Sequence, residues 1–294
     1  MNPAEIPVIL NMKSGTGKAR RVGDKITQAF RLCGLQAKII MAKKDIAGEA
    51  ATAVRDGHRL IVAGGGDGTI NAVASALVRT QAVLGVLPLG TFNHFARDLG
   101  IPLDLEAAVR VIAAGKAAQV DVGEVNGRTF INNSSVGLYP RIVLERLHEQ
   151  RGGHSKWMAF VLATWRVLHR LPRLQIRLAT GGTEIVHSTA FVFIGNNEYE
   201  IEGPKIGTRR TLNAGTLFCY VGHATTRWDL LRLAFDAVMG RLRRLEALDV
   251  LHGKEAWIAA RRRRLRVALD GEVVSLASPL HYRIRPGALR VIVP

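Results

Sequence analysis

Short apolar runs alternate with helical patterns along about the first 125 residues of the chain. Pro7–Asn11 has the length and composition of a buried strand, and a loop of Gly, Ser and Lys separates it from a helical pattern over about Ala19–Cys33. This alternation predicts a parallel sheet with helices on both faces. Further strands are predicted at Gln36–Met41, Leu60–Ala63 and Val83–Leu87, and further helices at Ile46–Asp56, Thr69–Val78, Phe92–Asp98 and Leu105–Ala114.

The pattern changes after about Asp121. Short β-like runs are separated by Gly-Gly, Asn-Gly and Asp-Gly turn signals, and helical stretches at about Lys156–His169 and Arg227–Met239 interrupt them. This pattern predicts a second, β-rich domain, and 294 residues are enough for two domains. The predicted strands are Val120–Val125, Thr129–Asn132, Leu174–Ala179, Ala190–Ile194, Thr216–Val221, Leu265–Leu269 and Leu289–Val293.

The composition adds a strong positive charge. There are 41 Lys and Arg residues against 24 Asp and Glu, so the formal net charge is +17. Such a chain is attracted to polyanions, which include nucleic acids, anionic lipid surfaces and phosphorylated small molecules. Two distant cysteines favour a reducing compartment. The longest apolar run, Trp157–Trp165, is too short to span a bilayer, so we expect a cytoplasmic protein that is at most peripheral to the inner face of the membrane.

Three loops follow predicted parallel strands, where ligands of open sheets bind. They are Asn11–Lys18, Gly64–Thr69 and Pro88–Asn93. Glycines let the backbone approach a phosphate, and N–H groups at a helix start favour an anion. Asp67 adds a carboxylate that can hold Mg²⁺ among these glycines. The loops therefore predict one phosphate-binding cleft.

Several standard motifs do not fit these loops or the rest of the chain. Around Gly17-Lys18, Met12 replaces the first glycine of a P-loop and Ala19 replaces its hydroxyl residue. A dinucleotide fingerprint that begins at Gly66 ends in Asn71 rather than glycine. The chain also has no H-E-x-x-H and no G-x-S-x-G, which argues against a zinc enzyme or a serine hydrolase.

Two blocks, Gly64–Asn71 and Pro88–Ala96, resemble the diacylglycerol kinase catalytic domain family, which includes bacterial diacylglycerol kinase-like proteins and sphingosine kinases. The resemblance continues through Asn133–Gly137, Gly195–Asn197 and Leu269–Glu272, and so spans nearly the whole chain. It implies an ATP- and Mg²⁺-dependent lipid kinase that phosphorylates a hydroxyl of diacylglycerol or a similar lipid.

The resemblance also implies a fold and a set of contacts. The fold is α/β, with a Rossmann-like parallel-sheet domain of the phosphofructokinase and NAD-kinase type over 1–125 and a β-sandwich domain that takes the lipid over 126–279. Strands from about 280–294 are expected to return to the first domain. The implied nucleotide contacts are Asn11, Gly65, Gly66, Asp67, Gly68, Thr69, Ile70, Asn71, Gly90, Thr91 and Asn93.

The resemblance assigns catalytic roles to two carboxylates. By itself, Asp270-Gly271 between two β-like runs indicates a hairpin turn. In the family the Glu after Asp-Gly accepts a proton, which implies that Glu272 is the base toward the lipid hydroxyl. Asp67 is then expected to hold the metal–nucleotide or a water network.

Two positions depart from the family pattern. Ala214 stands where many bacterial members have an Asp that binds a structural Mg²⁺, and a methyl group cannot ligate a hard cation. We therefore expect no metal beyond the Mg²⁺ carried with ATP. His94 replaces a frequent Asp beside the cleft.

Two further features leave alternatives open. The basic run Arg261–Arg264, with Arg241, Arg243 and Arg244 upstream, fits a solvated face or attraction to an anionic membrane. Nucleic acid is not expected as a partner, because no RNP-like motif or zinc finger accompanies the run. The apolar stripe of Lys156–Leu171 fits either core packing or an acyl-chain lining.

The sequence thus favours a lipid kinase and leaves rival functions. An NAD kinase-like enzyme would share the Gly64–Thr69 loop, and a catalytically impaired lipid- or nucleotide-binding protein would fit Ala214. A homodimer is one assembly that the sequence allows.

Overall fold

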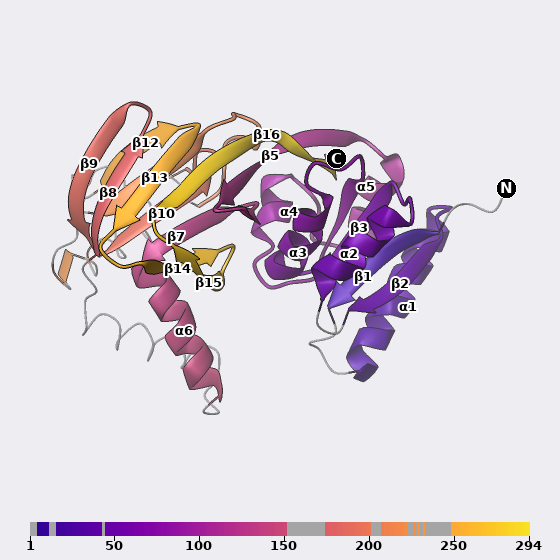
Figure 1. The fold of residues 1–294 in the computed structure, drawn as a ribbon. Coiled ribbons are helices and arrows are strands. Elements are labelled where there is room, and N and C mark those ends of the chain that lie inside the picture. The colour runs from indigo at the N-terminus through magenta and orange to yellow at the C-terminus, as the bar shows by residue number, and fades with distance from the viewer. Residues whose placement is uncertain are drawn as a thin grey trace. The chain divides into compact units, whose positions relative to one another are not determined.

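The computed structural model describes residues 5–11, 16–42, 45–151, 174–200, 207–222, 226, 228, 229, 232 and 248–294. The helix predicted at about Lys156–His169 and most of the one at Arg227–Met239 lie outside these residues. The chain forms two compact units (Figure 1). Unit 1 comprises residues 1–122 and 286–294, and unit 2 comprises residues 123–285.

Unit 1 contains a parallel sheet with the strand order β2-β1-β3-β4-β16. Its central strands are buried apolar runs, as expected for a parallel sheet that is covered on both faces. The strands that lie wholly in unit 1 are β1 (Ile6–Asn11), β2 (Ala37–Ala42), β3 (Leu60–Gly65) and β4 (Val83–Pro88).

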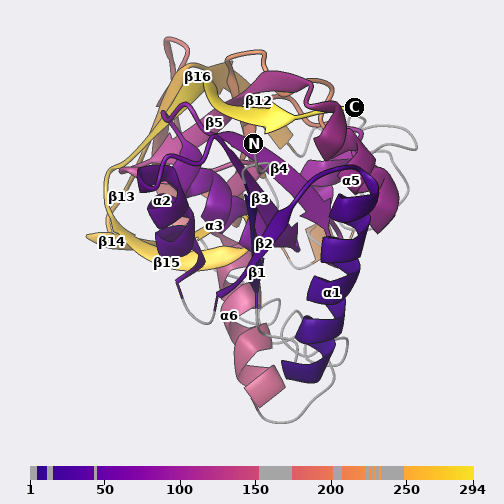
Figure 2. The same cartoon turned by 90° about the vertical axis from the view of Figure 1, so that its right-hand side faces the viewer.

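Helices cover both faces of this sheet (Figure 2). α1 contacts α5 on one face, and α2 contacts α3 on the other. Local signals fix the ends of α5: Asp104 caps its first turn by accepting a hydrogen bond from the Ala107 N–H, and Gly115 ends it in the left-handed conformation. The helices are α1 (Thr16–Leu32), α2 (Ile46–Arg55), α3 (Asp67–Leu77), α4 (His94–Asp98) and α5 (Leu105–Ala114).

Unit 2 is a sandwich of two antiparallel sheets. One sheet has the order β12-β11-β10-β7-β14-β15, and the other contains β16-β13-β8-β9 with β5 and β6 beside it. Its strands are β6 (Arg128–Phe130), β7 (Asn133–Gly137), β8 (Leu174–Thr180), β9 (Thr183–Thr189), β10 (Phe191–Asn196), β11 (Leu217–Gly222), β12 (Leu248–Gly253), β13 (Glu255–Ala260), β14 (Arg264–Leu269) and β15 (Glu272–Ala277).

The core of unit 2 joins side chains from both sheets. Val192 and Cys219 from one sheet and Leu178 and Ile258 from the other belong to the same buried cluster. Tyr282 is fully buried there, and its hydroxyl lies 3.0 Å from the Ser134 hydroxyl. The α/β domain followed by a β sandwich confirms the predicted fold class.

Two strands run from one unit into the other, β5 (Ala117–Val125) and β16 (Leu280–Ile292). In unit 1, β16 pairs in parallel with β4, with Arg290 opposite Val83. In unit 2, β16 pairs in antiparallel fashion with β13.

Several elements of unit 2 were not predicted from the sequence. The helix α6 (Leu138–Arg151) is one of them, although Pro140 is compatible with its first turn, where N–H groups have no helical partner. The strands β9, β12 and β13 were also missed.

Candidate functional site

The carboxyl ends of β1, β3 and β4 meet at one edge of the unit 1 sheet. The strands are parallel, and their register sets Leu10 beside Gly64 and Gly65 beside Pro88. Asn11, at the end of β1, therefore lies at the same edge as the two glycine loops that follow β3 and β4. Met12–Gly15 of the predicted Asn11–Lys18 loop lie outside the described residues.

The Gly64–Thr69 loop leads directly into α3. Gly66 is the residue before the helix, and its carbonyl accepts hydrogen bonds from the N–H groups of Thr69 and Ile70 at 2.9 and 3.1 Å. No side chain caps this end of α3. The first N–H groups of a helix lack helical partners, and together with the helix dipole they attract an anion.

The loops after β3 and β4 pack backbone against backbone. The Leu89 N–H donates to the Gly65 carbonyl at 3.0 Å. A Cβ added at Gly90 would lie 2.4 Å from the Cα of Gly66, which is closer than side-chain atoms approach. Glycine at position 90 is thus required by the close approach of the two loops.

Two polar side chains hold this arrangement. Asn93 is buried in the left-handed conformation, accepts from the Gly90 N–H at 2.9 Å and donates to the Gly90 carbonyl at 3.0 Å. Oδ1 of Asp67 accepts from the Phe95 N–H at 3.2 Å, so that carboxylate ties the start of α3 to the start of α4. Asp67 remains only half-buried.

The other predicted nucleotide contacts differ in exposure. Gly65 and Gly68 are half-buried and Thr91 is exposed, whereas Thr69 and Ile70 are buried. Asn71, one turn after Asp67, has a buried Oδ1 with no hydrogen-bond partner among the described atoms. The side chain of Ile70 is buried in the core, so a nucleotide contact from Ile70 would come from its backbone near the start of α3.

These features fit a bound phosphate. No side chain caps the first turn of α3, so N–H groups there are available to phosphate oxygens. Among the described residues no group of three His, Cys, Asp or Glu side chains could hold a metal ion. Asp67 is a half-buried carboxylate at this edge, and carboxylate oxygens are ligands that a divalent ion carried with phosphate accepts.

In unit 2 the Asp270-Gly271 turn joins β14 to β15. Both residues have positive φ, 47° and 87°, as in the two-residue hairpins that this dipeptide favours, and Leu269 pairs with Glu272. The hairpin is thus confirmed, and it leaves Glu272 exposed as the first residue of β15.

Asp270 itself is a structural centre, whereas the sequence pattern predicted only a turn residue. Its carboxylate accepts from the N–H groups of Ile131, Asn132 and Asn133 at 2.8, 2.8 and 2.9 Å. Burial raises the pKa of Asp270 to about 6, although these three bonds and the charge of Arg209 act in the opposite direction. The hairpin that presents Glu272 is therefore anchored to the segment before β7.

Arg209 supports the same segment. This buried side chain donates to the Ile131 carbonyl at 2.6 Å and to Oδ1 of Asn132 at 2.9 Å. Asn196 also donates to the Ile131 carbonyl, at 2.8 Å. The motifs at Asn133–Gly137 and Gly195–Asn197 thus belong to the framework that carries the hairpin.

The two departures from the family pattern lie in described loops. The Ala214 carbonyl accepts from the Thr216 hydroxyl at 3.3 Å, and its methyl group offers no ligand. The ring of exposed His94 stacks on that of Phe92, with centroids 5.7 Å apart. Within the described part of the chain no helix is both long and apolar enough to cross a membrane.

Comparisons with known proteins agree with this architecture. Residues 5–125 match the diacylglycerol kinase catalytic domain, and residues 143–293 match the YegS C-terminal NAD kinase beta sandwich-like domain. A solved diacylglycerol kinase structure from Bacillus anthracis, 20% identical, has the same fold with a TM-score of 0.72 and covers 100% of this chain and 98% of its own.

Curated bacterial relatives match over most of their length. A "Probable lipid kinase YegS" from Salmonella arizonae is 32% identical over 98% of this chain and 95% of its own. A "Probable lipid kinase YegS-like" from Citrobacter koseri is 32% identical over 81% of this chain and 79% of its own. The chain therefore belongs to the family of YegS-like lipid kinases with a diacylglycerol kinase catalytic domain.

Proposed function

We propose that the protein uses ATP and Mg²⁺ to phosphorylate a hydroxyl group of diacylglycerol or a similar lipid. One observation carries the nucleotide half of this proposal. The Gly64–Thr69 loop opens α3 directly against Gly90, and Asp67 ties both loops together at a site that suits a phosphate. Family membership supports lipid as the acceptor.

Each part of the nucleotide site has a proposed role. The backbone N–H groups at the start of α3 hold phosphate oxygens, and exposed Thr91 adds a hydroxyl donor. The half-buried carboxylate of Asp67 positions the metal–nucleotide. Bound Mg²⁺ would neutralise the charge that develops on the transferred phosphoryl group.

Glu272 is the proposed base. A lipid hydroxyl is a weak nucleophile at neutral pH, and a carboxylate within about 3 Å can accept its proton as the bond to phosphorus forms. Two features of Glu272 support this role. Its carboxylate is exposed to an incoming substrate, and its hairpin is fixed by the bonds to Asp270.

The proposed setting follows from the product and the charge. A kinase of this specificity is a transferase of phospholipid biosynthesis that works in the cytoplasm, at the inner face of the membrane. The net charge of +17 supports attraction to an anionic lipid surface. A homodimer is one assembly that we propose to test by light scattering.

Radiolabelled ATP with Mg²⁺ and a mixed lipid extract tests the proposal. We expect label in one neutral-lipid product for the wild type and none for Asp67→Asn. Asp104→Asn is a matched control, because an asparagine at this N-cap still accepts the bond from Ala107. With NAD added to the same mixture, labelled NADP and unlabelled lipid would instead identify an NAD kinase-like enzyme.

A catalytically impaired lipid- or nucleotide-binding protein is the second candidate. The absence of a carboxylate at Ala214 favours it. Stabilisation of the folded protein by ATP, with no labelled product from any lipid, would establish this candidate over the kinase.

A further inference from the structure

Four arginines gather around one pocket of unit 2, away from the glycine loops in the sequence. The pocket has a volume of about 250 Å³, and its lining includes Arg141 from α6 and Arg262, Arg264 and Arg266 from β14 and the turn before it. Of the described residues that line it, none is acidic. The predicted basic run therefore supplies only part of a larger cluster.

The strand geometry explains how the cluster forms. Side chains alternate along β14, so Leu265 and Val267 enter the core of unit 2 while Arg264 and Arg266 extend from the opposite face. Arg141 reaches the same pocket from the first turns of α6, directly after β7. The run at Arg261–Arg264 was recognised in the sequence, but Arg141 and Arg266 were missed because they lie far from it or outside it.

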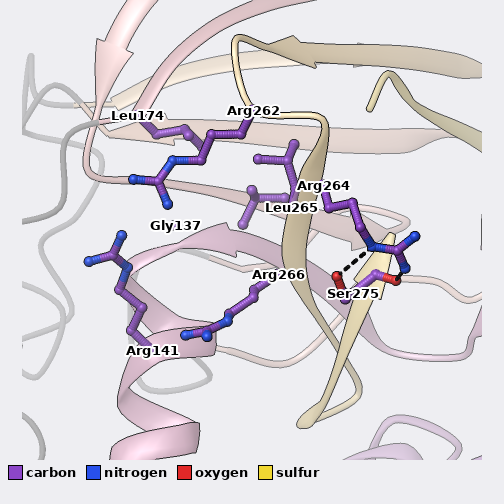
Figure 3. Close-up of a pocket in the computed structure, with 9 residues that line it drawn as sticks. Gly137, Arg141, Leu174, Arg262, Arg264, Leu265, Arg266 and Ser275 are labelled. Atoms are coloured by element: carbon purple, nitrogen blue, oxygen red, sulfur yellow. Dashed lines mark hydrogen bonds between the residues drawn. The ribbon is translucent and has the colours of Figure 1, made fainter. Parts of the chain in front are cut away.

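The guanidinium groups do not all have the same role. Arg264 donates to the Ser275 hydroxyl at 3.1 Å and to the Ser275 carbonyl at 2.6 Å. Figure 3 shows Arg264 turned toward Ser275, whereas Arg141, Arg262 and Arg266 extend on the side of Gly137. Three cationic groups thus face one space.

This arrangement is electrostatically costly without an anion. Arg141 is half-buried, and burial followed by the charges of Arg262 and Arg266 lowers its pKa. It also lies near the positive end of the α6 dipole, and the first turn of α6 has no acidic residue. An anion with several oxygens would relieve this repulsion and could accept paired bonds from the planar guanidinium groups.

The remaining lining selects among anions. Leu174, Leu265 and Val136 also line the pocket; Leu174 is half-buried, whereas Leu265 and Val136 belong to the core of unit 2 and expose almost no surface. A free polyphosphate has no carbon to place against the exposed part of Leu174, whereas a lipid presents glycerol carbons next to its phosphate.

We propose that Arg141, Arg262 and Arg266 form a binding site for the phosphate headgroup of an anionic phospholipid. The site anchors unit 2 to a lipid surface at one defined point, in addition to the diffuse attraction of a basic protein. This inference does not depend on the proposed kinase activity, because the pocket and the glycine loops share no residue.

Vesicle binding by the full chain tests the site. The probe is phosphatidylcholine vesicles with and without phosphatidic acid. The pocket variant is Arg141→Gln/Arg262→Gln, and the matched control is Arg261→Gln/Arg263→Gln, which removes the same charge from residues that do not line the pocket. We expect the pocket variant to bind phosphatidic acid vesicles about tenfold more weakly than the control, because it loses the paired hydrogen bonds as well as the charge. Equal losses in both variants would show that only diffuse charge acts and would overturn the proposal.

Two variants that preserve the charge distinguish a specific binding site from general electrostatic attraction. Arg141→Lys/Arg262→Lys keeps both charges but loses the bidentate geometry, so binding should fall several-fold, while Arg261→Lys/Arg263→Lys should bind like the wild type. Unchanged binding in both lysine variants would contradict the proposal. Thermal unfolding of each variant checks that the fold is retained.

Soluble phosphates distinguish the source of the ligand. We expect inorganic phosphate and glycerol 3-phosphate to displace the protein from vesicles only weakly, since neither supplies the apolar part. Displacement by either one at concentrations that match the affinity for the lipid would assign the pocket to a free phosphate and overturn the lipid proposal.

Discussion

The same dipeptide, Asp-Gly, occurs in both units with opposite environments. In unit 1, Asp67-Gly68 begins α3, and the carboxylate of Asp67 accepts one N–H bond and stays half-buried. In unit 2, Asp270-Gly271 forms a turn, and the carboxylate of Asp270 is buried on three N–H groups. The carboxylate of Asp67 is accessible to a ligand, whereas that of Asp270 is buried in hydrogen bonds within the fold. In this hairpin of unit 2 the accessible carboxylate is Glu272, two residues later.

The largest expected effect tests this division of roles at Glu272. Replacing Glu272 by Gln removes the proton acceptor, and kcat should fall by about 10²–10⁴-fold while the thermal stability stays that of the wild type. Glu184→Gln is the matched control, since Glu184 is an exposed residue near the start of the strand after the Gly181-Gly182 turn. A Glu272→Gln enzyme with wild-type turnover would remove the proposed base.

Asp270 should act on stability instead. Asp270→Ala leaves three buried N–H groups without their acceptor, so the free energy of unfolding should fall by about 3 kcal/mol or more in urea titrations. Asp270→Asn keeps one acceptor oxygen and should lie between the wild type and the alanine variant. An alanine variant as stable as the wild type would show that the hairpin is held by other contacts.

The pH dependence of that loss has a definite sign. Because the pKa of Asp270 is raised to about 6 in the folded state, its contribution to stability is largest below the ordinary carboxyl pKa and declines as the pH rises toward 6. The difference in unfolding free energy between the wild type and Asp270→Ala should therefore be greater at pH 4 than at pH 7. A difference that grows with pH would contradict the raised pKa.

Gly90 tests the close approach in unit 1. A methyl group at this position meets the Gly66 backbone, so Gly90→Ala should cost about 1–3 kcal/mol and weaken stabilisation by ATP, measured by thermal unfolding. Gly23→Ala is the control, because a Cβ in that helix meets Met41 and Ile39 at ordinary distances of 3.4 and 3.5 Å. If ATP stabilised Gly90→Ala as much as the wild type, the close approach of the two loops would not be needed for nucleotide binding.

The smallest effect is expected at Glu124 of unit 2, whose pKa is lowered whereas that of Asp270 is raised. Glu124 accepts hydrogen bonds from Arg283 at 2.6 Å and from Arg285 at 3.0 Å, and the bond from Arg285 is the first cause of its lowered pKa. Glu124→Gln should cost about 1.5 kcal/mol at pH 7. A lowered pKa stabilises above the ordinary value, so this cost should shrink as the pH falls below about 4.5.

The exposed ion pair of Arg177 and Glu184 provides the comparison for Glu124. Its removal by Glu184→Gln should change the unfolding free energy by less than about 0.5 kcal/mol. Equal effects of the two substitutions would show that partial burial adds nothing to the pairing of Glu124.

Much of unit 1 could be predicted from the sequence, because β1, β3 and β4 are continuous buried runs and each of the two glycine loops follows one of them directly. Leu105–Ala114 was predicted with the bounds that the structure gives it. The contact between Gly66 and Gly90 could not be predicted, since it depends on how adjacent strands are registered.

The elements of unit 2 were harder to predict from the sequence for a physical reason. Its strands pair across long separations, so an element such as β13 becomes apparent only beside β8 and β16. The hairpin at Asp270 was predicted from the local turn signal. The burial of Asp270 was not, because its partners lie more than a hundred residues earlier in the chain. The sequence revealed only part of the arginine pocket for the same reason, since Arg141 is brought next to Arg262 and Arg266 only by the folding of the chain.

The path of β16 has a consequence for biosynthesis. Unit 1 is interrupted: residues 286–294 complete it, and they emerge from the ribosome only after all of unit 2 has been made. Until then the β4 edge that pairs with Arg290 and Val291 has no strand beside it, and open edges invite wrong partners. The sheet of unit 1 can therefore be completed only after unit 2 has been synthesised, which links the maturation of the two units in time.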